Sequence, residues 1–168
     1  DFAFPHRYSN FVSLATALTL SRIQAQASLV EQVVKDHVKY GASSSSRCTL
    51  TPAFFVNVYP FESKLLAVKA FAKKSFRMPT FNDLYYADMG NSKLNPESAL
   101  QYDLGFVLNK DWKQGIVDHF RLQVDGYYNT VYDKIVAYPK GQQFRWTMLN
   151  LGKVHIKGVD AMAEVGLE

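Results

Sequence analysis

The aromatic residues best suited to ligand contact lie in one segment, between residues 78 and 98. Phe81, Tyr85 and Tyr86 carry rings that can contact an amphipathic ligand with little loss of conformational entropy. A connection of about twenty residues is also longer than a compact domain needs, unless the segment has a function of its own. We therefore predict that these three residues contact a substrate.

The polar and proline residues around these rings indicate a structural role. A proline fixes φ, and a glutamate can accept hydrogen bonds from loop N–H groups. Ordering a loop in this way requires no ligand, so we interpret these residues as shaping the segment rather than binding a substrate. The predicted loop-shaping residues are Arg77, Pro79, Asn95, Pro96 and Glu97.

The sequence contains no pattern typical of catalysis or metal binding. Cys48 is the only cysteine, which excludes an intrachain disulfide and a cysteine-based zinc cluster. No Ser-His-Asp arrangement and no phosphate-binding glycine loop stand out. We expect no enzyme activity, no cofactor and no metal. None of the histidines occurs in a paired metal-ligand spacing; they are His6, His37, His119 and His155.

The positive charge of the chain is dispersed. The net charge is +4 and the isoelectric point is about 9.1, yet the 19 Lys and Arg residues form no run of five or six. A nucleic-acid site would show a clustered basic surface, so we expect no nucleic-acid partner. The aromatic content of 14%, mostly Tyr and Phe, favours β-structure.

Apolar and polar residues alternate along the chain, as they do in a β-strand with two different faces. In the first such run, Val12, Leu14 and Leu18 fall on one face, and Ser13 and Ala15 fall on the other. The pattern therefore predicts an all-β fold of about seven strands. The predicted strands cover residues 11–20, 22–30, 49–59, 65–77, 100–108 and 120–136, and a seventh runs from 144 toward 165.

Three segments need separate interpretation. Ile23, Ala27 and Val30 also match helical spacing, so an amphipathic helix over residues 23–38 is an open alternative. The apolar phase of the seventh strand changes around Gly158, which predicts a β-bulge there. Residues 41–46, Gly-Ala-Ser-Ser-Ser-Ser, contain no apolar anchor and predict a long exposed loop.

The connections between the predicted strands alternate in length. Short turns at residues 21–22, 60–64 and 110–115 alternate with longer connections, which predicts antiparallel up-and-down hairpins like those of outer-membrane barrels. Seven strands do not close by the usual even-stranded rule, so two edges would remain unpaired. An isolated segment could therefore self-associate through its open edges. Alternation alone does not distinguish a membrane barrel from a soluble barrel with an apolar interior.

An ordered set of motifs carries a family resemblance. Residues 76–86 read FRMPTFNDLYY and are followed by Gly90-Asn91 and then by Leu94-Asn95-Pro96-Glu97. This stretch closely resembles a signature in the barrels of TonB-dependent receptors. Later segments resemble the same family in the same order: DGYYN at 125–129, DKI at 133–135, NLGKV at 150–154 and IKGVD at 156–160. The resemblance is clear from about residue 51 to 163 and weaker over 9–50.

The resemblance implies a segment of a 22-stranded barrel in the bacterial outer membrane, with residues 78–98 as a long extracellular loop. The parent receptor would contain a plug domain, draw energy from the TonB complex and import a scarce nutrient such as a siderophore, cobalamin or a glycan. The variant in this sequence resembles the receptors of Bacteroidetes-type bacteria. Residues 1–168 show neither a plug nor a TonB-contacting box, and the first residues lack a signal-peptide pattern. We expect a partial barrel that does not transport alone.

In such a barrel the apolar face contacts membrane lipid and the polar face lines the lumen against the plug. An aromatic girdle at the membrane interface is an equally good interpretation of Phe81, Tyr85 and Tyr86, and also of Tyr127, Tyr128, Tyr138 and Trp146. The alternative is a soluble all-β ligand-binding module with the apolar face as its core. The predicted lumen residues are Gln24, Gln26, Asn57, Lys69, Lys73, Gln101, Asp103, Gln123, Asp125 and Asn129.

Overall fold

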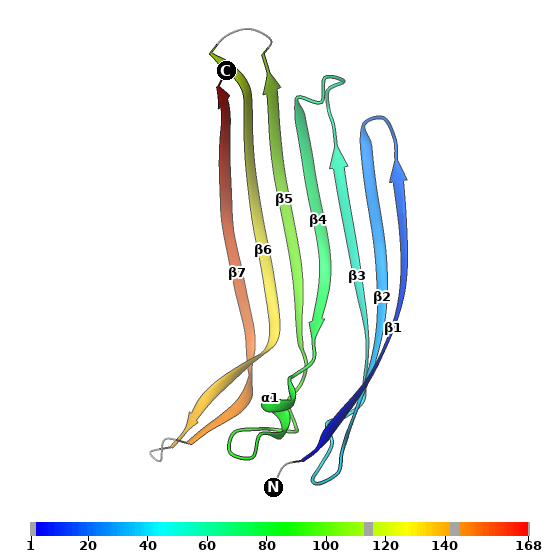
Figure 1. The fold of residues 1–168 in the computed structure, drawn as a ribbon, viewed down its shortest axis with the longest axis vertical. Coiled ribbons are helices and arrows are strands. Elements are labelled where there is room, and N and C mark those ends of the chain that lie inside the picture. Colours follow the sequence, from blue (N-terminus) through cyan, green and yellow to red (C-terminus); the bar gives the residue numbers. More distant parts are fainter. Residues whose placement is uncertain (1–2, 113–115, 142–144, 168) are drawn as a thin grey trace.

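Seven long strands form one antiparallel sheet in the computed structural model, which describes residues 3–112, 116–141 and 145–167. Each strand pairs with its neighbours in sequence, giving the order β1 to β7 (Figure 1). This result confirms the predicted all-β fold of seven up-and-down strands. The strands are β1 (Pro5–Thr19), β2 (Ile23–Val38), β3 (Arg47–Val58), β4 (Leu66–Arg77), β5 (Glu97–Asp111), β6 (Val117–Lys140) and β7 (Arg145–Leu167).

Short turns gather at one end of the sheet and longer connections at the other (Figure 1). Residues 20–22 and 59–65 join strands at the first end, which we call the turn end. Residues 39–46 and 78–96 join strands at the opposite end, the loop end. The predicted turn at 110–115 and the predicted start of the last strand at Phe144 fall partly on residues 113–115 and 142–144, outside the described residues.

Several strands extend beyond their predicted limits. β2 continues to Val38, and its last residues pair with the start of β1, as in Pro5↔Val38 and Arg7↔Asp36. The helical alternative for residues 23–38 is therefore wrong, because β2 is hydrogen-bonded to a strand on each side. β6 and β7, of 24 and 23 residues, extend furthest. Backbone pairing continues in these regions after the apolar alternation has ended.

The paired residues divide the sheet into an apolar face and a polar face. Leu14 pairs with Leu29, and Leu104 pairs with Ala70 and Gly126, so apolar residues line up across the strands. The side chains of Leu14, Leu18 and Leu104 are 73%, 54% and 51% exposed. They do not form the dry core that a soluble module would require. All ten predicted lumen residues lie on the polar face.

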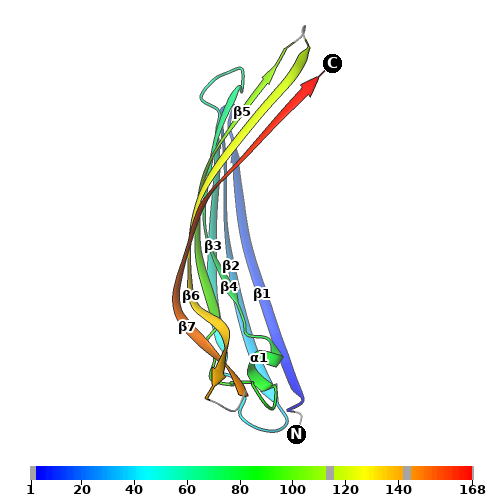
Figure 2. The same cartoon turned by 90° about the vertical axis from the view of Figure 1, so that its left-hand side faces the viewer.

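The register of β7 is unbroken at Gly158. Tyr127 pairs with Gly158 and Tyr128 with Lys157, and the one irregularity between the described residues of β6 and β7 lies at Val117/His119. The predicted β-bulge at Gly158 is therefore wrong. The apolar alternation changes phase because the apolar residues on the apolar face of β7 begin at Val159. The preceding residue on that face is Lys157. The sheet is bowed along its length (Figure 2).

A short helix, α1 (Phe81–Tyr85), interrupts the connection between β4 and β5, so residues 78–96 are not all irregular loop. The predicted loop of 78–98 overlaps β5 by two residues, because Glu97 and Ser98 already pair with Arg77 and Phe76. Within the described part of the chain, no helix has the length and apolar character needed to cross a membrane.

We predict that Gly158→Ala destabilises the sheet more than Gly126→Ala does. A Cβ on Gly158 would lie 2.6 Å from Cζ of Tyr127, whereas a Cβ on Gly126 would meet only the Leu104 carbonyl oxygen at 3.9 Å. Both changes restrict the unfolded chain equally, so the difference reports the clash, about 1 to 3 kcal/mol. Equilibrium urea unfolding measures this difference. Equal unfolding free energies for the two variants would contradict the packing of Tyr127 on Gly158.

Candidate functional site

Helix α1 forms because two reciprocal hydrogen bonds between Thr80 and Asp83 cap its first turn. The Thr80 N–H donates to Asp83 Oδ2 at 2.9 Å, and the Asp83 N–H donates to Thr80 Oγ1 at 3.2 Å. This reciprocal capping box satisfies N–H groups that a helix of five residues would otherwise leave open. The helix then directs Leu84, which is 2% exposed, into the interior of the loop end.

A close backbone crossing follows the helix. The Gly90 N–H donates to the Tyr86 carbonyl at 2.7 Å, and the Asn91 N–H donates to the Asp83 carbonyl at 2.8 Å. A Cβ on Gly90 would lie 2.5 Å from the Tyr86 nitrogen, so only glycine permits this approach. The Gly90-Asn91 pair therefore returns the chain toward the sheet.

The loop packs against β6 and β7 through apolar contacts. Leu84, Leu94 and Ile135 form a buried cluster, with Tyr85 and Met148 against it. Backbone bonds reinforce this contact, since the Met148 N–H donates to the Met89 carbonyl at 3.0 Å. Because Ile135 belongs to the polar face by alternation, the loop folds over that face rather than away from the sheet.

On the opposite side, Tyr85 ties the loop to β1 and β2. Asp36 accepts two hydrogen bonds from Arg7, at 2.7 and 2.8 Å, and one from the Tyr85 hydroxyl at 3.1 Å. The Ser44 N–H donates to the Tyr85 hydroxyl at 3.0 Å, and the Ser44 hydroxyl donates to Asp36 at 3.2 Å. Ser44 is 9% exposed, so the predicted exposure of residues 41–46 is wrong at this position. One of its two partners, Tyr85, lies 41 residues away in sequence.

Glu97 ties the end of the loop to β4 and β6. Its carboxylate accepts two bonds from Arg77, at 2.9 and 3.0 Å, and one from the Ile135 N–H at 2.7 Å. Lys134 Nζ lies 3.5 Å from the same carboxylate. Only 7% of Glu97 is exposed, which makes this a nearly buried charge with its partners in place.

Asp36 and Glu97 remain charged in this arrangement. Both lie at the loop end, beyond the apolar band of their strands. Burial opposes the charged form of each carboxyl group, but hydrogen bonds outweigh it and hold both pKa values below the ordinary range. The dominant favourable partners are Arg7 for Asp36 and Arg77 for Glu97. These contacts therefore persist at neutral pH.

Asn95 and Asn150 join the loop to β7. The Asn95 N–H donates to Asn150 Oδ1 at 2.8 Å, and Asn150 Nδ2 donates to the Asn95 carbonyl at 2.9 Å. Arg47 of β3 also donates to Asn95 Oδ1 at 2.9 Å. Asn150 was not among the predicted site residues. The one signal for it in the sequence is its place in the family-like segment at 150–154.

The three predicted substrate-contact residues occupy different environments. The Arg7 guanidinium lies 4.9 Å from the centre of the Phe81 ring, and the Phe81 and Tyr85 rings are 6.0 Å apart. Tyr85 is held by Asp36 and Ser44, whereas Tyr86 is 54% exposed. Pro79, within the loop, is fully buried. Ligand contact by these rings stays a prediction, with Tyr86 the best placed.

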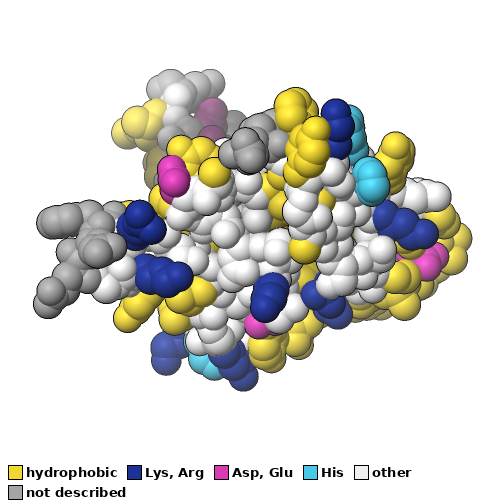
Figure 3. Space-filling model, turned by 90° about the horizontal axis from the view of Figure 1, so that it is seen from below, with side chains coloured by type: hydrophobic (Ala, Val, Ile, Leu, Met, Phe, Trp, Pro, Cys, Tyr) yellow, Lys and Arg dark blue, Asp and Glu magenta, His cyan; other side chains and the backbone are white. Residues whose placement is uncertain are grey.

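Seen from the loop end, Lys and Arg side chains lie among hydrophobic ones around the rim (Figure 3). No group of three or more His, Cys, Asp or Glu residues in the described ranges could hold a metal ion. The site is an anchored loop with exposed aromatic and basic side chains.

A family model described as "TonB dependent receptor-like, beta-barrel" matches residues 18–167. Two curated relatives are vitamin B12 transporters named BtuB. The protein of Vibrio vulnificus is 30% identical over 94 residues, covering 55% of this chain and 14% of that protein. The protein of Photobacterium profundum is 31% identical over 108 residues, covering 58% and 16%. The chain thus spans about a sixth of their length or less.

Solved structures share the fold at low sequence identity. The hemophore receptor HasR of Serratia marcescens, as a double mutant in complex with its hemophore HasA and heme, gives a TM-score of 0.81 at 13% identity. The match covers 95% of this chain and 32% of that one. The copper transporter OprC gives a TM-score of 0.74 at 16% identity, covering 95% and 26%.

We predict that Tyr85→Phe loosens the loop and Tyr86→Phe does not. The first change removes the hydroxyl shared by Asp36 and Ser44, which costs about 1 to 3 kcal/mol of local stability. Amide hydrogen exchange in residues 78–96 should accelerate about five- to hundredfold. Tyr86→Phe is the matched control, because no hydrogen bond of its hydroxyl occurs within the described ranges. Equal exchange in both variants would refute the anchoring role of Tyr85.

Proposed function

This chain belongs to the family of TonB-dependent receptor β-barrels, and from that premise we propose that it forms part of an outer-membrane receptor for uptake of a scarce nutrient. The observation that carries the proposal is the exposed apolar face of the sheet, with Leu14 73% and Leu104 51% exposed. An apolar surface of this extent is stable in contact with lipid, and the opposite polar face suits a water-filled lumen.

The open edges of the sheet support a place within a larger barrel. β1 pairs only with β2, and β7 pairs only with β6, among the strands of the described residues. In lipid, each unpaired N–H or C=O group at such an edge costs on the order of several kcal/mol, because no water is present to satisfy it. We propose that further strands continue the sheet on both sides toward a total of 22. A plug domain and the TonB complex complete the proposed receptor.

The proposed orientation places the loop end outside the cell. Residues 78–96 then form an extracellular loop that folds over the lumen, with the exposed Tyr86 ring directed to an incoming ligand. The names of the relatives above mention vitamin B12, heme and copper, and a further structure of the same fold is the FrpB iron transporter of Neisseria meningitidis, so the substrate class is a metal-containing nutrient in this proposal. Membrane lipid is the proposed partner of the apolar face.

We predict that Leu104→Arg destabilises the protein in lipid far more than Gln101→Arg does. Leu104 lies in the middle of the apolar face of β5, while Gln101 lies on the polar face of the same strand. Arginine at the bilayer midplane costs about 2 to 4 kcal/mol, and a lumen position avoids this cost. Unfolding in phospholipid vesicles gives both values. A larger loss for Gln101→Arg would contradict the lipid-facing assignment and favour the soluble module.

Orientation and transport are tested in whole cells producing the complete receptor. In a Cys48→Ser background, a membrane-impermeant maleimide should label Lys93→Cys in the loop and leave Glu62→Cys at the turn end unlabelled. Uptake of vitamin B12, heme, iron and copper, each with and without TonB, then tests the activity. Labelling of Glu62→Cys alone would reverse the orientation, and TonB-independent uptake of every substrate would overturn the receptor proposal.

A further inference from the structure

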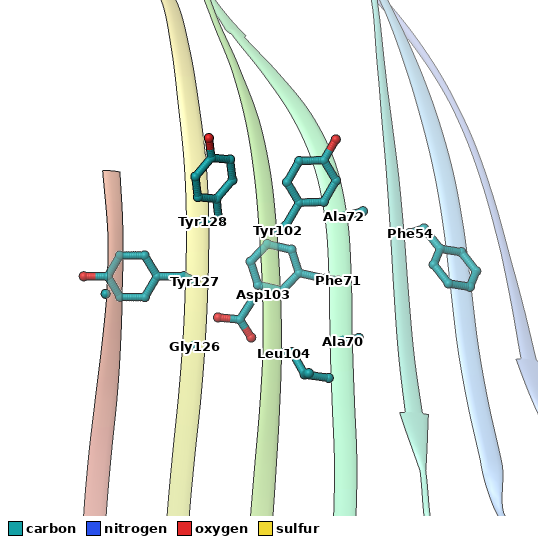
Figure 4. Close-up of a pocket in the computed structure, with 11 residues that line it drawn as sticks. Phe54, Ala70, Phe71, Ala72, Tyr102, Asp103, Leu104, Gly126, Tyr127 and Tyr128 are labelled. Atoms are coloured by element: carbon teal, nitrogen blue, oxygen red, sulfur yellow. The ribbon is translucent and has the colours of Figure 1, made fainter. Parts of the chain in front are cut away.

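An open groove of about 510 Å³ crosses the apolar face over β3 to β7 (Figure 4). Its floor is made by the small residues Ala70, Ala72 and Gly126, which leave the surface low between larger neighbours. The volume lies within the range of small-molecule sites, roughly 300 to 1,000 Å³. The larger residues at its sides are Phe54, Tyr102, Leu104 and Tyr128.

The two tyrosines give this groove a polar end. Their hydroxyl groups point in the same direction, toward the loop end, while the Leu104 side chain lies on the turn side (Figure 4). The Tyr128 hydroxyl forms a hydrogen bond with His155 Nδ1 at 2.8 Å, and the two rings stack at 5.7 Å. The groove is therefore apolar over most of its length and polar at one end.

Two lysines flank the polar end on the same face. Lys157 is the direct cross-strand partner of Tyr128. Lys74 pairs with Leu100 and follows Ala72 by two residues, one step nearer the loop end. Neither lysine takes part in an ion pair among the described residues. Both positive charges are thus available to an anionic group placed above the tyrosines.

We infer that this groove binds a membrane lipid with an anionic phosphate headgroup. One acyl chain lies on the floor of Ala70, Ala72 and Gly126, and the phosphate is held by Lys74 and Lys157 beyond the tyrosine hydroxyls. The two lysine charges favour an anionic headgroup, and the apolar part of the groove favours an acyl chain. This inference rests on the proposed membrane location of the sheet, and it goes further by giving one lipid a fixed site.

The geometry favours a lipid over a second copy of this chain. A protein surface docking there would have to fill this groove and also neutralise two lysines at one end. A lipid has this combination in one molecule, because its acyl chain and phosphate lie in line along the membrane normal. The tyrosine hydroxyls lie on the loop side of Leu104, so the polar and apolar parts of the groove follow one another along the strands (Figure 4).

The test uses the complete receptor, purified in mild detergent and equilibrated with equal amounts of phosphatidylglycerol and phosphatidylcholine of the same chain length. Native mass spectrometry counts the lipids that remain bound. We expect wild-type receptor to retain phosphatidylglycerol several-fold over phosphatidylcholine. The K74Q/K157Q double variant should reduce this ratio to about one. Gly126→Leu, which fills the floor, should lower retention of both lipids.

The matched control is K35Q/K110Q, which removes two lysines from the same face away from the groove, one on β2 near the loop end and one on β5 near the turn end. It should keep the wild-type ratio. Ala72→Leu provides a second groove-filling variant if Gly126→Leu does not fold. Equal ratios for the two lysine double variants, or wild-type retention after both groove fillings, would overturn the lipid site. Maleimide labelling of Lys93→Cys in the same strain separates this failure from failure of the proposed outer-membrane location.

Discussion

Backbone pairing between neighbouring strands is the constraint on which the rest of this structure depends. A strand that meets lipid has no water to satisfy its N–H and C=O groups, so each must pair with a neighbour. The ladder from β1 to β7 meets this demand over most of the sheet, with one shift of register among the described pairs, at Val117/His119 near the turn end. β3 and β4 pair over six residues each, 53–58 with 68–73. An unbroken register also fixes alternation, because a one-residue slip would turn every side chain to the other face.

The same register explains why the loop end differs from the middle of the sheet. From the turn end to the middle, the polar face carries groups suited to water, such as Gln24, Asn57 and the Lys69–Asp125 ion pair at 3.1 Å. Toward the loop end, Val34 and Ile135 on that face are buried. The folded loop packs against Ile135. Asp36 and Glu97 lie beside Arg7 and Arg77 because each carboxylate is the direct cross-strand partner of its arginine. One connection thereby links β2 with β7, which are not neighbours in the sheet.

Alternation in the sequence was enough to predict seven strands and both faces, because period two reflects burial against lipid or water directly. The prediction from alternation failed where the contrast between apolar and polar positions ends. Residues 31–38 stay in β2 through backbone pairing, which leaves no mark in hydropathy. Around Gly158, the apolar band ends, and this change in the sequence pattern resembles the change that a β-bulge causes. Helix α1 was missed because five residues and one capping box are too short to show a helical period.

The candidate site depends on contacts that no local pattern encodes. Asp36 and Tyr85 are 49 residues apart, and Asn95 and Asn150 are 55 apart, so only the folded sheet brings them together. Residue type alone also treats Tyr85 and Tyr86 alike. The fold separates them, since the loop uses the Tyr85 hydroxyl for its own anchoring and leaves the Tyr86 ring 54% exposed. A ligand arriving from the loop end can contact only what the loop has not already used, which makes exposure after folding the better guide to binding than aromatic character.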